Sequence, residues 1–182
     1  MHGMLEWRIR EAGADDLAEI ALIGAATILE TYAGVVDCAD MLAFCAQGHS
    51  AAAYAAYLAD GSRIWLAEAV ATGVPLGYVM LSKPDLEAAR EGDVEVKRIY
   101  TLTRMQGSGL GTALMDCAVA AAAGHARVLL GVKADNVRAI AFYGKHGFAA
   151  IGTRRFLTGQ TWHHDLVLAR ILAADLSMET PR

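Results

Sequence analysis

A glycine-rich turn at residues 106–112, which reads Gln-Gly-Ser-Gly-Leu-Gly-Thr, constrains this chain most. It separates a β-branched, apolar run at 94–102 from an alanine- and leucine-rich helical run at 113–123. Glycine lets a ligand approach the backbone closely, and the first N–H groups of a helix have no partner inside that helix. The helix dipole also favours negative charge at this end. The turn therefore predicts a phosphate site, made by the backbone N–H groups of Gly107, Gly109, Gly111 and Thr112.

Two known phosphate-binding loops fit this turn poorly. A P-loop needs Lys followed by Ser or Thr after its last glycine, whereas Gly111 is followed by Thr112 and Ala113. A dinucleotide-binding fingerprint counted from Gly107 and Gly109 places Thr112 where a small residue is needed. The chain also lacks, at the usual offset after the turn, the acidic residue that ends the second strand of a dinucleotide-binding fold. Taken alone, the turn could also be an ordinary corner between a strand and a helix.

The composition limits the class of protein. A length of 182 residues suits one domain with a sizeable core, and a net charge of −4 argues against a nucleic-acid-binding surface. We expect neither a signal peptide nor a membrane span, because no apolar run reaches the roughly 18 residues that a span needs. Three cysteines without metal-like spacing indicate reduced thiols and a cytoplasmic protein. His163 and His164 would point to opposite faces of a strand, so we expect no metal site.

Hydrophobic periodicity and turn residues predict the order of the elements. We expect strands at 7–11, 63–70, 75–82, 93–102, 127–132, 148–157 and 162–171, and helices at 14–32, in pieces over 36–60, from the glycine turn to 124, and at 136–146. This order predicts an α/β (α+β) fold with a mixed sheet of six or seven strands and helices on both faces. We expect one domain over 1–172 and a frayed tail over 173–182.

Two motifs together resemble a known family. The pattern Gln106-x-x-Gly109-x-Gly111, between a strand and a helix, resembles the coenzyme A signature of the GNAT N-acetyltransferases. Residues 136–148, which read Asn-Val-Arg-Ala-Ile-Ala-Phe-Tyr-Gly-Lys-His-Gly-Phe, resemble the second signature of that family. The strand order and the spacing of the motifs agree, so the resemblance covers nearly the whole chain. Within the family, 130–132, 155–159 and 165–166 are similar to bacterial polyamine acetyltransferases of the PaiA type.

The resemblance implies a binding mode for acetyl-CoA as co-substrate. The pyrophosphate would lie on the glycine turn, and the pantetheine arm would pair with the strand edge at 99–102, which the splay of two central parallel strands leaves open. The N–H of Tyr100 or Thr101 would hold the thioester oxygen. The residues that the resemblance places against coenzyme A are Ile99, Tyr100, Thr101, Gln106, Gly107, Ser108, Gly109, Leu110, Gly111, Thr112, Asn136, Tyr143 and Lys145. Asn136 could instead be only a helix cap, and Lys145 and Arg104 could be ordinary solvated charges.

The resemblance also suggests two catalytic residues. Glu95 stands eleven residues before Gln106, at the position of a catalytic glutamate in several family members, and would act as general base. The alternative is that Glu95 pairs with Lys97 or Lys83 on a solvated strand face. Tyr143 stands at the position of the family tyrosine and would protonate the departing thiolate. Its spacing from Ile140 also suits a residue of the core.

The acetyl acceptor is the least constrained part of the prediction. A polyamine or another small cationic amine would suit acidic and aromatic residues of the expected acceptor side, namely Glu30, Asp37, Asp40, Asp85, Glu87, Tyr32, Trp65, Tyr78 and Trp162. A protein N-terminus or an aminoglycoside would also suit an acidic groove. We keep open a homodimer, and as other classes a catalytically weak acetyl-CoA sensor and a Rossmann-like nucleotide binder.

Overall fold

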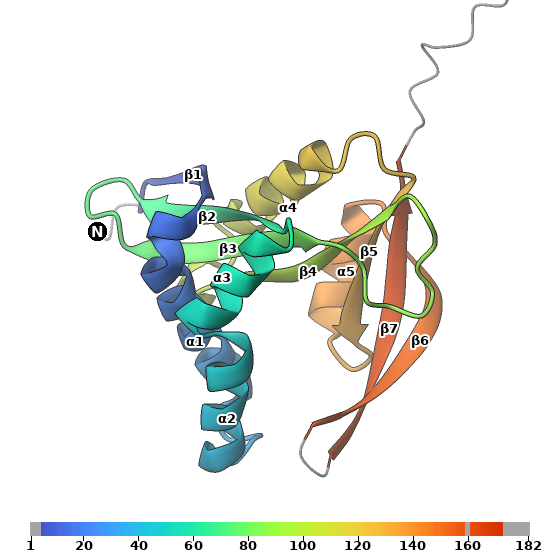
Figure 1. Cartoon of the computed structure of the whole chain (residues 1–182), viewed down its shortest axis with the longest axis horizontal. Helices are drawn as coiled ribbons and strands as arrows, with labels where there is room; N and C mark the ends of the chain where they lie inside the picture. The colour runs from blue at the N-terminus through green and yellow to red at the C-terminus, as the bar shows by residue number, and fades with distance from the viewer. Residues whose placement is uncertain (1–4, 159–160, 173–182) are drawn as a thin grey trace, which may run out of the picture. The chain divides into compact units, whose positions relative to one another are not determined.

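The computed structural model describes residues 5–158 and 161–172, with the side chains of 156–163 outside the description. The described residues form two compact units (Figure 1). The first unit contains the residues up to Ser82 together with Arg98–Ala118, and the second contains Lys83–Lys97 and the residues from Val119 onward. Strand β4 (Asp93–Thr101) and helix α4 (Leu110–Ala121) each contribute to both units.

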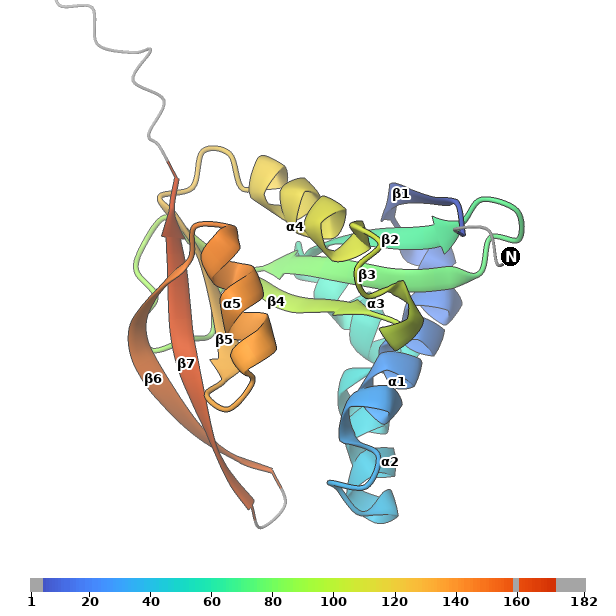
Figure 2. The same ribbon diagram turned by 180° about the vertical axis from the view of Figure 1, so that it is seen from behind.

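The first unit is a mixed assembly of strands and helices. Its elements are β1 (Trp7–Ala12), α1 (Leu17–Tyr32), α2 (Cys38–Gly48), α3 (Ala51–Ala59), β2 (Arg63–Ala69), β3 (Pro75–Ser82), the end of β4 and most of α4. The strands are hydrogen-bonded in the order β1-β2-β3-β4, with β1, β2 and β3 antiparallel. Helices α1 and α3 cover one face of these strands, and α4 lies on the other (Figures 1 and 2).

The helices begin and end where local chemistry favours it. The side chain of Asp37 accepts a hydrogen bond from the N–H of Asp40 and caps α2, and Ser50 caps α3 by accepting from Ala53. A turn of 3₁₀ helix over Ala14–Asp16 precedes α1. These caps explain why the helical segment after α1 is divided in two.

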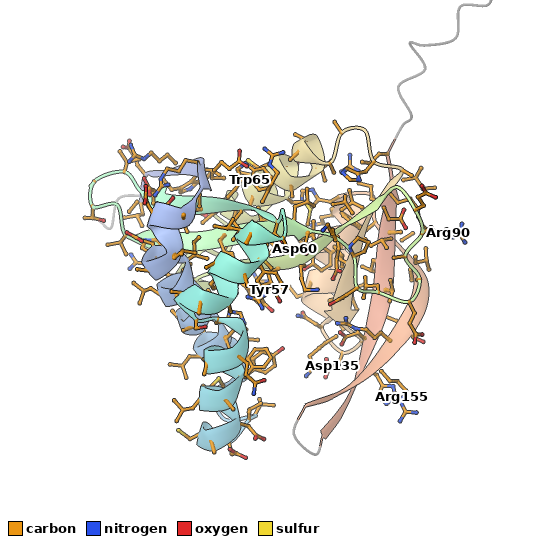
Figure 3. The ribbon with its side chains drawn as sticks, viewed as in Figure 1. Tyr57, Asp60, Trp65, Arg90, Asp135 and Arg155 are labelled. Carbon is orange, nitrogen blue, oxygen red and sulfur yellow. The ribbon has the colours of Figure 1, made fainter. Side chains whose placement is uncertain are left out.

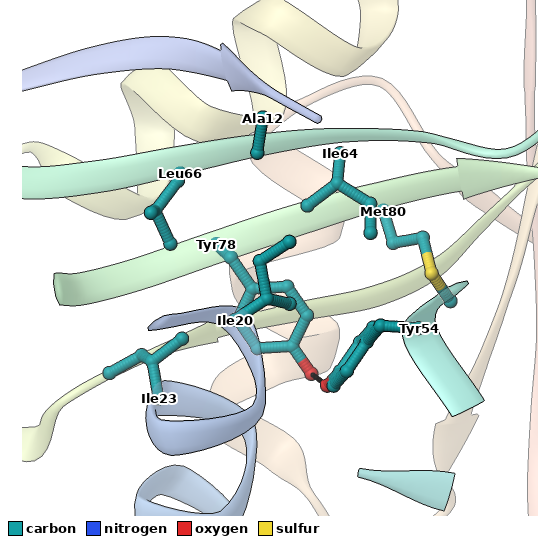
Figure 4. Packing of buried hydrophobic residues seen from close by; sticks show 8 residues of the cluster. All are labelled: Ala12, Ile20, Ile23, Tyr54, Ile64, Leu66, Tyr78 and Met80. Atoms are coloured by element: carbon teal, nitrogen blue, oxygen red, sulfur yellow. Dashed lines mark hydrogen bonds between the residues drawn. The ribbon is translucent and has the colours of Figure 1, made fainter. Parts of the chain in front are cut away.

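Apolar side chains from helix and strand meet in the core of the first unit (Figure 4). The cluster consists of Ala12, Ile20, Ile23, Tyr54, Ile64, Leu66, Tyr78 and Met80. Tyr78 and Tyr54 carry hydroxyls into this apolar setting, and the two oxygens are hydrogen-bonded to each other at 2.8 Å. A buried hydroxyl without a partner is costly, so the pairing makes the two tyrosines acceptable core residues.

The second unit contains the start of β4, β5 (Arg127–Lys133), α5 (Val137–Lys145), β6 (Ala149–Thr158) and β7 (Thr161–Ile171). The strands are hydrogen-bonded in the order β4-β5-β7-β6, and α5 lies against one face of β5 and β7 (Figure 2). The turn after α5 uses Gly147, whose φ of +81° suits a helix C-terminus. The core of this unit joins Leu129, Val167 and Ala169 with Leu86 from the segment before β4.

The parallel pair β4–β5 is short. Its register runs from Asp93 opposite Arg127 to Glu95 opposite Leu129, whereas β7 follows β5 along its whole length to Lys133. A buried ion pair holds the first rung, because Nε and an amino nitrogen of Arg127 donate to the two carboxylate oxygens of Asp93 at 3.0 and 2.6 Å. The side chains are 16% and 1% exposed, respectively. This fork-shaped contact fixes where β4 begins to pair with β5, and Glu95 of β4 therefore lies opposite Leu129 of β5.

The structure confirms the expected fold class, with seven strands of which β4 and β5 are parallel. Each expected strand and helix is present with ends shifted by a few residues, except that the first helix begins as a 3₁₀ turn. The expected tail at 173–182 lies outside the described residues, and the prediction of a single domain over 1–172 stays a prediction.

We expect Asp93→Asn to lower the free energy of unfolding by about 3 kcal/mol, because it leaves the buried Arg127 guanidinium without its counter-charge. The Arg127 guanidinium lowers the pKa of Asp93. The ion pair therefore stabilises the fold above the unfolded pKa of about 3.9, and this contribution is lost as the pH falls through the lower folded pKa. The free energy of unfolding of the variant, measured with denaturant, should therefore change less between neutral and acidic pH than that of the wild type.

Asp135→Asn is the matched control, because Asp135 is an exposed carboxylate in the turn before α5 (Figure 3). We expect its unfolding curve to match the wild type. Equal stability of Asp93→Asn and Asp135→Asn between pH 4 and 7 would contradict a structural role for the buried pair.

Candidate functional site

The glycine turn presents unpaired donors. In the described part of the chain, no hydrogen bond is made by the N–H groups of Gly107, Gly109, Gly111 and Thr112. Gly107 and Gly109 have φ angles of +80° and +84°, and the space where their β-carbons would stand is open. Four unpaired donors thus lie at the start of α4, where the helix dipole favours an anion, and the binding of a phosphate there stays a prediction.

Ser108 holds this turn in shape. Its hydroxyl donates to the carbonyl of Met105 at 2.7 Å and accepts from the N–H of Leu110 at 3.3 Å. The N–H of Ser108 also donates to the Met105 carbonyl at 3.2 Å. Leu110, expected to contact coenzyme A, has its N–H occupied by Ser108 and its side chain fully buried. Its side chain therefore anchors the turn to the core.

Gly107 and Gly109 differ from Gly111 in backbone conformation. A positive φ applies to Gly107 and Gly109, whereas Gly111 lies inside α4. The backbone reason for glycine therefore holds at 107 and 109. At Gly111 only close approach of a ligand to the helix start would require it.

The expected pantetheine edge lies at the end of β4 in the first unit. Ile99, Tyr100 and Thr101 are partly exposed, and the ring of Tyr100 lies 6.0 Å from that of Tyr78. Gly77 on β3 makes this arrangement possible, because a β-carbon there would lie 2.7 Å from the Tyr100 carbonyl oxygen. Sequence reasoning missed Gly77; the signal was a glycine inside a strand pattern, which marks close backbone approach.

Glu95 lies in the second unit and is only 3% exposed. Its carboxylate accepts a hydrogen bond from the N–H of Asp85 at 3.0 Å, and Nζ of Lys97 is 3.9 Å away. Burial raises the pKa of Glu95, although the Asp85 N–H and the Lys97 charge act against the rise. The pairing with Lys97 is therefore present, but on a buried face and not on the solvated one considered from the sequence.

Charged neighbours surround Glu95 within the second unit. Lys97 donates to the carboxylate of Asp85, and Arg154 on β6 lies 3.7 Å from Asp85 and 3.2 Å from Asp165. Asp85 was expected on the acceptor side, where it would attract a cation. Partial desolvation acts to raise the pKa of Asp85, but the hydrogen bond from Lys97 and the charges of Lys97 and Arg154 outweigh it and lower the pKa. The side chain is still 60% exposed. No sequence signal linked Asp85 with Arg154, which stand 69 residues apart in the chain.

Tyr143 on α5 is also in the second unit and is buried between aromatic rings. The centroids of Phe142 and Phe148 lie 5.4 and 6.0 Å from its ring. Burial raises the pKa of Tyr143 to about 12. Within the described residues its hydroxyl makes no hydrogen bond.

The remaining expected contacts lie at the ends of α5 and before the glycine turn. Asn136 caps α5, because its side-chain oxygen accepts from the N–H of Ala139 at 3.1 Å. The cap role considered from the sequence is therefore confirmed, and the side-chain amide donors are not needed for it. Lys145 and Arg104 are exposed. Gln106 is exposed and lies at the end of a 3₁₀ turn, Thr103–Met105.

Each unit thus carries part of the expected site. The first unit joins the 99–101 strand edge and the 106–112 turn through one continuous segment, and the second brings Glu95 into its charged network. Among the residues that the structure describes, no three His, Cys, Asp or Glu side chains are grouped to hold a metal ion. In the same part of the chain, no helix combines the length and apolar character that crossing a membrane requires.

Comparison with solved structures identifies related folds. The PaiA N-acetyltransferase of Thermoplasma acidophilum in complex with coenzyme A superposes with a TM-score of 0.74 at 18% identity, covering 92% of this chain and all of that chain. The ribosomal-protein-alanine N-acetyltransferase of Brucella melitensis gives a TM-score of 0.64 at 22% identity over 91% of this chain and 99% of that one. At these identities the likeness concerns the fold.

Sequence comparison identifies the family. An uncharacterised N-acetyltransferase of Mycobacterium tuberculosis is 36% identical over 159 residues, which are 86% of this chain and 98% of the relative. The model of the acetyltransferase (GNAT) family matches residues 35–148. This match includes the glycine turn and the second motif. The chain therefore belongs to the GNAT acetyltransferase family and is an acyltransferase that uses acetyl-CoA.

Proposed function

We propose that this enzyme transfers the acetyl group of acetyl-CoA to a small primary amine, by direct attack of the amine on the thioester. The observation that carries the proposal is the set of four unpaired N–H groups at the start of α4. The pyrophosphate of the co-substrate is a dianion that such a cradle can bind, since the donors are already oriented. The pantetheine arm would run along the 99–101 edge.

Glu95 suits the role of general base in this proposal. The attacking amine is an ammonium ion in solution, with a pKa near 10.4, and must lose a proton. A solvated glutamate, with a pKa of roughly 4.3, is a poor base for that step. Burial raises the pKa of Glu95 and narrows the gap. Its second carboxylate oxygen, beyond the one bonded to Asp85, would take the proton directly or through a water molecule.

Tyr143 suits the role of hydrogen-bond donor to the departing sulfur. A free thiol has a pKa of roughly 8.5, so a tyrosine with a pKa of about 12 is the weaker acid. Full transfer of its proton to a relaxed thiolate would be uphill by more than three orders of magnitude in equilibrium constant. We therefore propose that Tyr143 stabilises the charge developing on sulfur while the C–S bond breaks, and that solvent supplies the final proton.

Several residues expected on the acceptor side make contacts within the chain. Glu30 accepts hydrogen bonds from the N–H and hydroxyl of Thr103, at 2.8 and 3.0 Å, and Asp37 caps α2. Tyr78 is fully buried and cannot stack on a ligand. Glu30 and Asp37 nevertheless stay exposed, so of these three residues only Tyr78 leaves the set that could contact a cationic acceptor. A polyamine, an aminoglycoside or a protein N-terminus remains a compound to test, and the side chain of Trp162 lies outside the description.

Thiol release with a panel of amines tests the proposed function. We expect acetyl-CoA to raise the melting temperature, NAD to have no effect, and at least one small amine to accelerate release of free coenzyme A. Binding of acetyl-CoA without acceleration by polyamines, amino acids, aminoglycosides or N-terminal peptides would favour the sensor function instead.

We expect Gly109→Ala to raise the dissociation constant of acetyl-CoA by about tenfold or more, because a β-carbon at a positive φ strains or redirects the cradle. Gly73→Ala is the matched control, since Gly73 also has a positive φ, of +71°, with open space around it, but lies in the β2–β3 turn. Both variants should lose about 1 kcal/mol of stability. Calorimetry that gives the same acetyl-CoA affinity for both would contradict the assigned cradle.

We expect Glu95→Gln to lower kcat by roughly 10²- to 10⁴-fold at neutral pH, with little change in acetyl-CoA affinity. Wild-type activity should fall as the pH drops through the raised pKa of Glu95, because the base must be unprotonated. In the variant the deficit should shrink at high pH, where the amine loses its proton unaided. Glu91→Gln, at an exposed carboxylate, is the control, and equal pH–rate profiles for all three proteins would assign the base elsewhere.

We expect Tyr143→Phe to lower kcat with the melting temperature and acetyl-CoA affinity unchanged, because the hydroxyl has no partner among the described residues. Acetyl thioesters of more acidic thiols should restore turnover, since their thiolates need less stabilisation. Full activity of the folded variant with acetyl-CoA would show that Tyr143 serves packing only.

A further inference from the structure

Arg98 is a cation without a carboxylate partner. It lies on β4 in the first unit, half-buried, and donates a hydrogen bond to the carbonyl of Gly48. Its guanidinium lies over the rings of Tyr54 and Tyr57, 5.2 and 5.0 Å from their centroids. Among the described residues it forms no ion pair. Burying a charge is costly unless the charge is paired, and an anion bound at Arg98 would offset this cost.

The groups around Arg98 are neutral. Nδ1 of His49 is hydrogen-bonded to the Tyr54 hydroxyl at 3.0 Å, and that hydroxyl is hydrogen-bonded to Tyr78. Burial, and next the charge of Arg98, lower the pKa of His49 to about 3, so this imidazole is uncharged at neutral pH. Burial likewise raises the pKa values of Tyr54 and Tyr78. The carbonyl of Gly48, at the C-terminus of α2, offers at most about half a negative charge.

Gly48 leaves space for the Arg98 guanidinium. A β-carbon on Gly48 would lie 3.2 Å from a terminal nitrogen of Arg98, which is tighter than ordinary contact. Tyr57 projects from α3 (Figure 3), so aromatic and backbone groups of α2 and α3 together orient the planar fork. A guanidinium carries five N–H donors, and Arg98 uses some of them on the Gly48 carbonyl and on Tyr54, so the remaining donors are enough to bind a carboxylate with two hydrogen bonds.

Arg98 also stands next to the proposed reacting position. Residues two apart on a strand share a face and are separated by about 7 Å, so Arg98 and Tyr100 are neighbours on one face of β4. Tyr100 is one of the two residues proposed to bind the thioester oxygen. A group held by Arg98 would therefore lie within a small molecule's length of the acetyl carbon.

We propose that Arg98 binds a carboxylate of the acceptor, so that the acetylated substrate is a small amine that also carries an acid, such as an amino acid. This inference rests on the proposed function. The ammonium first loses a proton to Glu95, the amine nitrogen then forms the bond to the acetyl carbon and loses its second proton to solvent, and the C–S bond breaks. The carboxylate is unchanged, and the products are an N-acetyl acid and coenzyme A as its thiol once solvent supplies the last proton.

Pairs of amines that differ only in the acid test this proposal. Lysine and cadaverine form one pair, and ornithine and putrescine form another. We expect wild-type kcat/KM to favour the acid in at least one pair, and Arg98→Gln to lower kcat/KM for that acid by about 10- to 100-fold with no comparable loss for its decarboxylated partner. Arg98→Lys, which keeps the charge but not the fork, should lose an intermediate amount.

Two controls separate binding from structure. Arg90→Gln removes an exposed guanidinium that projects from the loop before β4 (Figure 3) and should change neither substrate. Arg98→Gln should lose some stability, because it removes the hydrogen bond to Gly48 and the contacts with the rings of Tyr54 and Tyr57, so the difference between acids and amines carries the test. A clear loss of stability in both Arg98 variants, with equal effects on acids and amines, would mean that Arg98 is structural.

The outcomes distinguish this inference from the proposed function. Equal wild-type turnover of acids and amines, or an equal loss for both in Arg98→Gln, overturns the carboxylate site and leaves acetyl transfer intact. Turnover of no amine overturns the proposed function, and calorimetry with lysine then decides the site separately. Lysine binding that disappears in Arg98→Gln would support the site, and identical or absent binding in both proteins would refute it.

Discussion

The buried fork between Asp93 and Arg127 is the contact on which the second unit depends. It sets the first rung of the only parallel strand pair in the described residues, and two residues further along β4 Glu95 lies opposite Leu129 of β5. The charge of Glu95 would be costly there without the Asp85 N–H and the nearby Lys97. Asp93, which forms the structural ion pair, and Glu95, the proposed base, thus stand two residues apart on the same face of β4, and both are buried.

Glu95 and Arg98 illustrate two ways of treating a charge in a protein interior. Around Glu95, three carboxylates and two cations nearly balance, so the pKa of Glu95 reflects mainly burial. Around Arg98, neutral rings and a carbonyl leave most of the positive charge uncompensated. The first arrangement sets the pKa of Glu95. The second leaves Arg98 able to pair with the carboxylate of a ligand, as we propose. Only side-chain geometry distinguishes them.

The sequence predicted the elements and the glycine cradle because both depend on local chemistry. Gly107 and Gly109 stand where the backbone needs positive φ, and Gly147 ends a helix for the same reason. Partners far apart in the chain could not be predicted in this way. The contacts of the exposed Asp85 with Lys97 and Arg154 have no signal in the sequence, and Tyr78 was expected to stack on a ligand although it is a core residue. The roles of Glu95, Tyr143 and the coenzyme A contacts remain predictions carried by the family resemblance.

The hydrogen bonds of Ser108 have a further consequence for how the co-substrate is bound. The turn is already held by its own side chain before any ligand arrives, so little backbone freedom is left to lose on binding. Binding of the co-substrate should then occur in a single kinetic phase that follows the encounter of the two molecules, without a slow step for loop rearrangement. A single hydroxyl would in that case set the kinetic character of the first binding step as much as the glycines set its specificity.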